Sequence, residues 1–578
     1  MVNLKINGMN VSVPEGSTIL EAARVAGIRI PTLCYLKEIN AIGACRICMV
    51  EVKGARSMVA ACVYPVSEGM EVTTNSDKVL AARKTTLELI LSDHNRACLS
   101  CPRSLNCELQ ALSKEYGCDS ARFAGEVPES IYDDATEYLV RDNSKCILCR
   151  RCVAVCKNVQ EVSVIGATER GFSTKISCAF DEDLSKNPCV ACGQCINVCP
   201  TGALHEKEEI DDVKAALADP EKVVIVGCAP SVRAGLGEEF GYPIGTNVEG
   251  KLATALKLLG FDKVFDVNFA ADMTIMEESN ELIERVEKGG KLPLITSCSP
   301  GWVRYMEFYY PELMENVSSC KSPQQMFGAL IKTYYAEKNG IDPKNIFVVS
   351  VMPCVAKKFE KTRDYQNASG YPDIDASLTT RELAKFIKEK GIMFNCLPDG
   401  QMDNPLGEFS GAGVIFGATG GVMEAALRTA VEKLTGETLG KLDFKEVRGM
   451  EGIKEASYKV GGLDVKVAVA SGLKNAKVLC EKIKSGEADY QFVEIMCCPG
   501  GCVNGGGQPI LDTYTRREVD YKALRAKALY DEDAAKTIRK SHENPVVKEI
   551  YENYLGKPGS HKAHEILHTK YVKRNKYN

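Results

Sequence analysis

Two closely spaced runs of cysteines limit what this chain can fold into more than any other feature. Each run has the spacing C-x2-C-x2-C-x3-C, and the second run is followed directly by Pro200. The eight residues are Cys146, Cys149, Cys152 and Cys156, then Cys189, Cys192, Cys195 and Cys199. Loops this short let three thiolates converge on one inorganic cluster while the fourth reaches a second cluster. The segment is therefore predicted to fold around metal clusters.

The spacing is that of bacterial two-cluster ferredoxins, in which the last cysteine of each run binds the other cluster. One [4Fe–4S] cluster would then take Cys146, Cys149, Cys152 and Cys199, and the other would take Cys156, Cys189, Cys192 and Cys195. Zinc is the alternative, but zinc sites usually combine pairs of cysteines across longer gaps. The pattern therefore favours iron–sulfur clusters.

The chain as a whole has 578 residues, 26 of them cysteine, and a formal net charge of -5. The chain has no excess of basic residues, so its charge does not suggest a nucleic-acid partner. No apolar run reaches the length of a membrane span, and the first residues alternate like a strand and do not resemble a signal peptide. We therefore expect a cytoplasmic, reducing location, where cysteines bind metals and seldom form disulfides.

Two further groups of metal-binding residues precede these runs. Residues 1–77 alternate like a small sheet with one helix, and their cysteines Cys34, Cys45, Cys48 and Cys62 suit a [2Fe–2S] cluster. Their spacing differs from the plant-type pattern, so zinc competes on spacing alone. The second group is His94, Cys98, Cys101 and Cys107. Taken in isolation, this group is typical of a Cys3His zinc site.

From about residue 210 the pattern changes to apolar strands alternating with amphipathic helices. Strands are predicted in VVIVG, KLPLITS, NIFVVSVM, GVIFGATGG, VKVAVASG and FVEIM, with helices at 272–288 and 380–390. Such alternation predicts an α/β architecture with largely parallel strands. The tail after Arg517 is polar and helical, and its HEILH segment (564–568) is interpreted as a chance match to a zinc-protease motif on a solvated helix.

Three cysteine motifs each follow a short apolar strand in this region. They are TSCSPGW (296–302), MPCVAKKFE (352–360) and EIMCCPGGCVNGGGQP (494–509). Cofactors in α/β folds bind outside the carboxyl ends of strands, so the three motifs can converge on one site. The glycines at 505–507 would allow close backbone approach to a bulky ligand. Buried structural thiols are the alternative for any one motif.

Taken together, these motifs resemble those of the large, monomeric, clostridial-type [FeFe]-hydrogenases. The resemblance implies a multidomain α+β and α/β protein, with ferredoxin-like iron–sulfur domains followed by a two-lobed α/β catalytic domain. The expected domains are a [2Fe–2S] domain at 1–77, a His/Cys3 [4Fe–4S] domain at 78–125, a two-[4Fe–4S] domain at 126–209 and an H-cluster domain at 210–578. The first two modules also resemble an iron–sulfur subunit of NADH dehydrogenases. By resemblance, the His94 group holds a [4Fe–4S] cluster and not zinc.

The family's H-cluster is a [4Fe–4S] cubane joined through a cysteine to a diiron unit with CO, cyanide and a dithiolate bridge. The resemblance makes Cys354, Cys498 and Cys502 cubane ligands, with Cys502 also bridging to the diiron unit. Lys357 and Ser231 would donate hydrogen bonds to the cyanides. The remaining pocket residues would be Met352, Met496, Pro230, Gln324 and Phe416.

One residue departs from the family pattern. The first signature is usually TSCCP, whose first cysteine donates protons and whose second is the fourth cubane ligand. Here Cys298 takes the proton-donor place and Ser299 takes the ligand place. Serine is a hard, high-pKa ligand that suits iron–sulfur clusters poorly. Ser299 could bind as alkoxide, three cysteines could hold the cubane, or Cys298 could become the ligand.

Proton delivery requires exchangeable groups that end beside the cofactor. By resemblance the path is Cys298, Glu278, Ser318, Glu281 and Arg285. Without the resemblance, Glu278, Glu281 and Arg285 would be interpreted as a solvated salt-bridge ladder on one helical face. Cys497, beside Cys498, could tune the cluster or become oxidised, although core packing is the more ordinary interpretation.

The implied activity is that of a reversible hydrogenase, 2 H+ + 2 reduced ferredoxin to H2 + 2 oxidised ferredoxin. Its partners would be ferredoxin or flavodoxin and the maturation proteins that install the diiron unit; its cofactors would be the H-cluster, three accessory [4Fe–4S] clusters and one [2Fe–2S] cluster. One alternative is a hydrogen-sensing or impaired relative, because of Ser299. A second is an electron-transfer subunit without chemistry of its own, which the three C-terminal motifs argue against.

Overall fold

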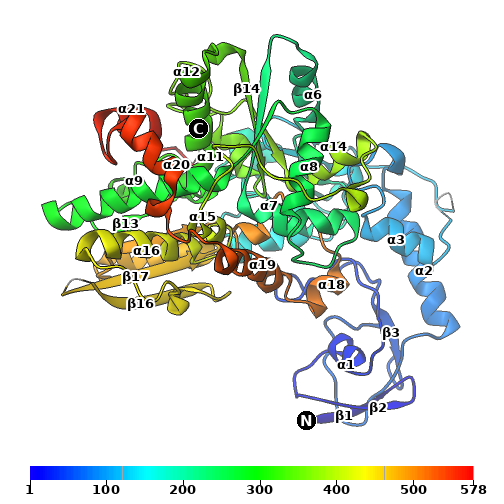
Figure 1. The fold of residues 1–578 in the computed structure, drawn as a ribbon. Helices are drawn as coiled ribbons and strands as arrows, with labels where there is room; N and C mark the ends of the chain where they lie inside the picture. The colour runs from blue at the N-terminus through cyan, green and yellow to red at the C-terminus, as the bar shows by residue number, and fades with distance from the viewer. Residues whose placement is uncertain (120–121, 461, 577–578) are drawn as a thin grey trace. The chain divides into compact units, whose positions relative to one another are not determined.

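A computed structural model of the chain describes residues 1–119, 122–460 and 462–576 (Figure 1). It divides into two compact units. The first comprises 1–187, 198–205 and 510–519, and the second comprises 188–197, 206–509 and 520–578. Within the described residues, none of the helices combines the length and the apolar character that a membrane crossing requires.

The N-terminal part of the first unit is a five-stranded sheet with one helix, as the alternating sequence predicted. Its strand order is β2-β1-β5-β3-β4. The bounds are β1 Val2–Ile6, β2 Met9–Val13, β3 Met49–Val52, β4 Val59–Ala60, β5 Glu71–Thr73 and α1 Ile19–Val25. Thr18 begins the helix with a capping box, in which its side chain accepts from the Glu21 N–H and the Glu21 carboxylate accepts from the Thr18 N–H. Ile6, Ile19 and Val50 are fully buried between sheet and helix.

The rest of the first unit consists of short elements between cysteine-rich loops. Helix α2 Asp77–Ser92 packs against α3 Glu108–Glu115. Strands β6 Tyr132–Asp133 and β7 Leu139–Asp142 are neighbours in a three-stranded sheet, and β8 Gly166–Thr168 pairs with β9 Lys175–Ser177 in a two-stranded hairpin. With so little regular structure, bound clusters can contribute a large part of the stability of such a segment.

The second unit contains two four-stranded sheets. In the first sheet, strand order β12-β11-β14-β15, all neighbours are parallel. Its strands are β11 Val223–Cys228, β12 Lys263–Asp266, β14 Ile346–Met352 and β15 Ala376–Thr379. Helices α8 Glu249–Leu259, α9 Val267–Lys288, α11 Pro323–Leu330 and α14 Thr380–Glu389 alternate with them. This is the parallel α/β pattern that the alternation predicted.

The second sheet has the order β13-β18-β17-β16. Strands β13 Leu294–Ile295, β18 Phe492–Met496 and β17 Leu463–Ser471 are parallel, and β16 Ile453–Val460 runs antiparallel at the edge. Helices α16 Gly421–Thr435 and α17 Leu473–Ser485 belong to this sheet's lobe. The two sheets give the second unit two lobes, as expected.

One predicted strand is wrong. The segment GVIFGATGG forms the end of helix α15 Gly411–Ile415, a tight turn and the start of α16. A short apolar run does not distinguish a buried helix from a buried strand. A Cβ on Gly413 would lie 2.6 Å from the Asn268 carbonyl oxygen of α9. The glycine therefore allows α15 to approach α9 closely.

The C-terminal segment returns to α9 through helices α19 Tyr521–Ala535, α20 Pro545–Ile550 and α21 His561–Leu567. His568 is largely buried, with its Nε2 3.1 Å from the Glu277 carboxylate and its Nδ1 2.8 Å from the Ser319 hydroxyl. The interpretation of HEILH as a motif on a solvated helix is therefore wrong for His568, which holds the tail against α9.

Candidate functional site

The three cysteine motifs meet in the second unit. Cys298 and Ser299 follow β13, Cys354 follows β14, and Cys498 and Cys502 follow β18. All five line one cavity of about 80 Å³. Because parallel strands end at the same edge of a sheet, loops from both sheets can reach this common space.

The residues expected around a diiron unit line the same cavity. They are Pro230, Ser231, Gln324, Met352, Lys357, Phe416 and Met496. Its wall is mainly apolar, with a few polar groups at defined places, as is usual for cofactor sites. The structure therefore brings together every residue that the sequence assigned to this pocket.

Lys357 places a buried positive charge at the cavity. Its Nζ donates to the Ser322 hydroxyl at 2.7 Å, to the Glu360 carboxylate at 2.8 Å and to the Cys298 carbonyl at 3.3 Å. Gln324 donates to the Lys357 carbonyl at 3.3 Å and to Glu360 at 3.2 Å. Glu360 and Ser322 thus position the ammonium, and sequence analysis missed them. The i, i+3 spacing of Lys357 and Glu360 within one motif could have identified Glu360.

Ser231 lies at the start of helix α7 Pro230–Gly235. Its hydroxyl is 3.4 Å from the Gly417 carbonyl, and its own carbonyl accepts from Gln508 Nε2 at 2.8 Å. A Cβ on Gly417 would lie 2.3 Å from the Ser231 oxygen. Glycine at 417 is therefore needed for this hydroxyl to reach the cavity wall.

The glycines at 505–507 serve the packing of the loop itself. A Cβ on Gly505 would lie 2.0 Å from the Pro353 carbonyl oxygen, and one on Gly506 would lie 2.3 Å from that of Cys192. We expected these glycines to let the backbone approach a ligand closely. In the structure, Gly505 and Gly506 instead let it approach the main chain of neighbouring loops. This packing fixes Cys502 beside the loop that carries Cys354.

Glu278, Glu281 and Arg285 share one face of α9, which the Asp266 side chain caps and Gly289 ends with a φ of 74°. Glu278 is fully buried, so the solvated-ladder interpretation is wrong for it. Burial raises its pKa to about 8, although the Ser297 N–H and hydroxyl donate to its Oε1 at 3.3 and 3.4 Å. Ser297 was another residue that the sequence did not identify.

The outer part of this row is an ion-pair and hydroxyl network. The Ser318 hydroxyl donates to Glu281 Oε2 at 2.8 Å, and Arg285 Nη2 lies 2.6 Å from Glu281 Oε1. Glu281 and Arg285 side chains are 18% and 15% exposed, which places them at the edge of solvent. At the inner end, burial and the nearby Glu278 carboxylate raise the pKa of the Cys298 thiol well above its ordinary value.

Ser299 is nearly buried at the start of helix α10 Pro300–Tyr309, where its side chain makes no capping bond. Its hydroxyl instead accepts from the Cys497 N–H at 3.1 Å. The serine is thus joined to the motif after β18 through backbone, close to the cysteines of that motif.

The accessory-cluster residues lie partly together within the first unit. Cys34, Cys45, Cys48 and Cys62 are neighbours, with sulfur contacts that link Cys34 to Cys45 and Cys62, and Cys48 to Cys62. Cys107 and Cys101 lie near each other, as do Cys146, Cys149 and Cys199. The other predicted residues of this unit are Cys98, Cys152, Cys156 and His94, whose buried Nδ1 has no hydrogen-bond partner in the described part of the chain. Cys189, Cys192 and Cys195 belong to the second unit.

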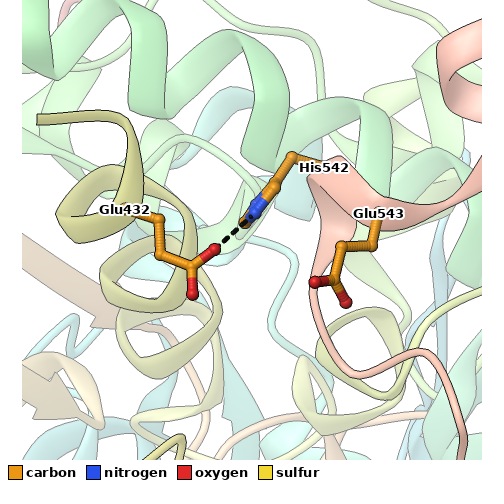
Figure 2. A group of neighbouring side chains, drawn as sticks. All are labelled: Glu432, His542 and Glu543. Atoms are coloured by element: carbon orange, nitrogen blue, oxygen red, sulfur yellow. Dashed lines mark hydrogen bonds and ion pairs between the residues drawn. The ribbon is translucent and has the colours of Figure 1, made fainter. Parts of the chain in front are cut away.

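A separate group, Glu432, His542 and Glu543, has the composition of a small metal site (Figure 2). His542 Nε2 lies 2.9 Å from Glu432. The Lys540 ammonium lies 2.8 Å from the Glu432 carboxylate and 2.9 Å from that of Glu543. A lysine therefore already supplies the positive charge that these carboxylates attract, and the group is an ion-pair network.

Models of known protein families match nearly the whole chain. Residues 222–506 match "Iron only hydrogenase large subunit, C-terminal domain", and residues 519–574 match "Iron hydrogenase small subunit". A 2Fe-2S iron-sulfur cluster binding domain matches 1–77, an iron-sulfur binding region of NADH-ubiquinone oxidoreductase-G matches 83–122, and the ferredoxin-like domain of NADH-quinone oxidoreductase subunit 3 matches 137–205. These matches favour iron–sulfur clusters over zinc. Each range falls inside one of the four expected domains, whose ends stay predictions.

Individual relatives agree along the full length. The chain is 50% identical to the NADP-reducing hydrogenase subunit HndD of Solidesulfovibrio fructosivorans, over 100% of both chains. It is 47% identical to iron hydrogenase 1 of Clostridium pasteurianum, over 99% of this chain and 100% of that one. Among solved structures, apo [FeFe]-hydrogenase HydA1 of Chlamydomonas reinhardtii matches with a TM-score of 0.57 and 45% identity, covering 64% of this chain and 99% of that one.

Proposed function

Because the chain belongs to the iron-only, or [FeFe], hydrogenases, we propose that it is a reversible hydrogenase that exchanges electrons with a ferredoxin. Hydrogenase chemistry at an H-cluster and the presence of [2Fe–2S] and [4Fe–4S] domains follow from the family itself. The electron partner and the roles of individual residues are the proposal. The observation that carries it is the single cavity lined by all three cysteine motifs and Lys357.

The cavity's donors fit an H-cluster. Cys354, Cys498 and Cys502 offer soft sulfur ligands, which iron–sulfur clusters prefer. When bound, the H-cluster supplies an iron site at which H2 is split or formed. In our proposal the three cysteines hold the cubane, and Cys502 also holds the diiron unit.

The other residues of the cavity orient and shield that group. The Lys357 ammonium and the Ser231 hydroxyl are donors that can bind anionic cyanide ligands. Met352 and Met496 would pack beside the diiron unit, while Pro230, Gln324 and Phe416 shape the remaining wall. The apolar lining excludes water, so each of these electrostatic contacts acts in a low-dielectric space.

Protons reach the site through the row of groups on α9. Cys298 would exchange the proton at the inner end of this path, and Glu278 would receive it in the buried interior. Ser318 and Glu281 continue the path to Arg285 at the surface. A carboxyl with a pKa of about 8 is near the operating pH, where proton exchange in both directions is efficient.

The accessory clusters, once bound, would supply a route for electrons between the H-cluster and an external carrier. We propose ferredoxin or flavodoxin as that carrier, dedicated maturation proteins for installing the diiron unit, and a reducing, cytoplasmic location that keeps cluster thiolates available. A second candidate partner is a nicotinamide-linked subunit, since a relative 50% identical over its whole length is named a subunit of an NADP-reducing hydrogenase.

Measured H2 evolution tests this proposal. Anaerobic protein carrying the diiron unit is assayed with reduced methyl viologen, then with reduced ferredoxin, and then with NADPH. We expect activity with viologen and ferredoxin. Activity with NADPH that appears only after a fraction containing a partner protein is added would support the nicotinamide-linked subunit as the partner. No activity with viologen, despite confirmed cofactor, would contradict the catalytic proposal and favour a sensor.

A further inference from the structure

The cavity contains more sulfur donors than the three cysteines assigned so far. A [4Fe–4S] cubane needs a ligand at each of its iron corners, and Cys354, Cys498 and Cys502 supply three. The place expected for the fourth ligand holds Ser299. A serine hydroxyl keeps its proton far above neutral pH and is a harder donor than a thiolate, so it is a poor match for this position.

Cys497 lines the same cavity and is 5% exposed. Its N–H donates to the Ser299 hydroxyl at 3.1 Å, so the two residues are direct neighbours. The Ser299 oxygen therefore already serves as a hydrogen-bond acceptor that positions the backbone of residue 497. This contact gives the serine a structural use that needs no iron.

The sulfur of Cys497 lies on the side of the cavity where Ser299 stands. A Cβ placed on Gly301 would be 2.7 Å from Cys497 Sγ and 3.2 Å from its Cβ. Gly301 belongs to the first turn of α10, which begins directly after Ser299. Because Gly301 has no side chain, the Cys497 sulfur has room to lie against it. Gly301 itself lies two residues after Ser299, the position of the expected ligand.

The same thiol makes sulfur contacts with Cys498 and Cys192. Cys498 is an assigned cubane ligand, so the two adjacent thiols are presented to one space. Cys298, the other thiol near Ser299, lies toward Glu278 and the proton path. Of the two cysteines, Cys497 can therefore become a ligand without removing a group from that path.

We propose that Cys497 supplies the fourth thiolate of the cubane in place of Ser299, a ligand exchange between neighbouring positions. The step is a substitution and not a redox reaction: the Cys497 thiol releases its proton to solvent, its sulfur binds the fourth iron, and the water previously bound to that iron leaves. This inference deepens the proposed function and rests on the chain binding a cubane. It does not rest on H2 turnover.

The test uses full-length protein produced without the diiron unit, so that only iron–sulfur clusters are present. Four variants are compared with the parent: Cys497→Ala, Ser299→Ala, Cys497→Ala with Ser299→Cys, and Cys480→Ala as a buried cysteine outside the cavity. Iron per chain and the electron paramagnetic resonance spectrum of the reduced protein are recorded. Mild oxidation then reveals a [3Fe–4S] signal wherever one corner of a cubane lacks a firm ligand.

We expect Cys497→Ala to lose up to about four iron atoms per chain or to give a [3Fe–4S] signal after oxidation. Ser299→Ala and Cys480→Ala should keep the parent's iron content and spectrum. The double variant Cys497→Ala with Ser299→Cys returns a thiol to the site and should restore both the iron content and the spectrum. This recovery would also show that the protein folds with alanine at 497.

Two outcomes would overturn the inference. The first is loss of the cubane in Ser299→Ala with retention in Cys497→Ala, which would make the serine the ligand. The second is a change confined to the accessory-cluster signals in Cys497→Ala, which would assign this thiol to Cys192's cluster. Failure of the proposed electron partner, or of H2 turnover, would leave these spectra and iron counts unchanged.

Discussion

Replacing Glu278 by glutamine removes a buried carboxyl whose proton should be held up to mildly alkaline pH. The side chain is fully buried, and burial raises its pKa from 4.5 to about 8. At about 1.4 kcal/mol for each pKa unit, this shift corresponds to about 5 kcal/mol in favour of the neutral form. About nine in ten molecules would then carry the proton at pH 7, whereas an exposed glutamate would be almost entirely ionised.

The sign of the effect on stability follows from where the proton is bound. Between pH 4.5 and about 8 the folded protein keeps the Glu278 proton and the unfolded chain releases it. The contribution of this group to stability is therefore greatest at low pH and is lost as pH rises through that window. Glu278→Gln has no such slope, so its free energy of unfolding relative to the parent should rise by up to about 1.4 kcal/mol per pH unit there.

Infrared difference spectroscopy measures the proton directly. The protonated carboxyl band present in the parent and absent in Glu278→Gln should disappear with a midpoint near pH 8. Glu284→Gln, at an exposed position of the same helix, is the matched control. H2 evolution at pH 7 should fall by roughly 100-fold or more in Glu278→Gln only. A midpoint below about pH 6 would refute the reasoning, because it would mean that water solvates this carboxylate.

Three other changes have defined outcomes. Glu281→Gln should lower H2 evolution roughly 100-fold without changing iron content, since it removes the exchangeable group between Ser318 and Arg285; unchanged turnover would exclude Glu281 from the path. Lys357→Met should lower the free energy of unfolding of cluster-free protein by about 3–5 kcal/mol, because it leaves Glu360 buried without its positively charged partner. Adding Glu360→Gln should recover most of this loss, and a Lys357→Met variant as stable as the parent would contradict the prediction. Gly227→Ala should cost about 1–3 kcal/mol, because its Cβ would lie 2.6 Å from the Phe327 ring, and Phe327→Leu should relieve the loss in a denaturation assay.

The sequence was most informative where local chemistry and periodicity coincide. The three cysteine motifs could be placed at strand ends because an apolar run stops directly before each of them, and the structure has β13, β14 and β18 there. The small N-terminal sheet and its one helix were predictable from the alternation of residues 1–77, and in the structure Thr18 caps that helix.

Tertiary environment decided what the sequence could not. GVIF is equally compatible with a buried strand or a helix, and the structure has a helix there that packs closely on α9 at Gly413. The burial of Glu278 depends on residues remote in the chain, so an i, i+3, i+7 row alone suggested a solvated ladder. Likewise, the position of the Cys497 sulfur against Gly301 follows from the packing of β18's loop on α10.

The contacts of the last residues with α9 and α10 have a consequence for chain continuity. His568 binds the Glu277 carboxylate, Tyr571 donates to the Ser318 carbonyl, and Arg574 binds the Glu307 carboxylate. Each of these bonds joins two segments that are far apart in the sequence. The segment that matches a family model called a small subunit (519–574) is also held near its start, where Arg525 pairs with Glu238 at 2.7 Å. A chain cut near Tyr514, which is 54% exposed, would thus yield two polypeptides whose association replaces covalent linkage. The stability of the pair would then depend on protein concentration, which the single chain avoids.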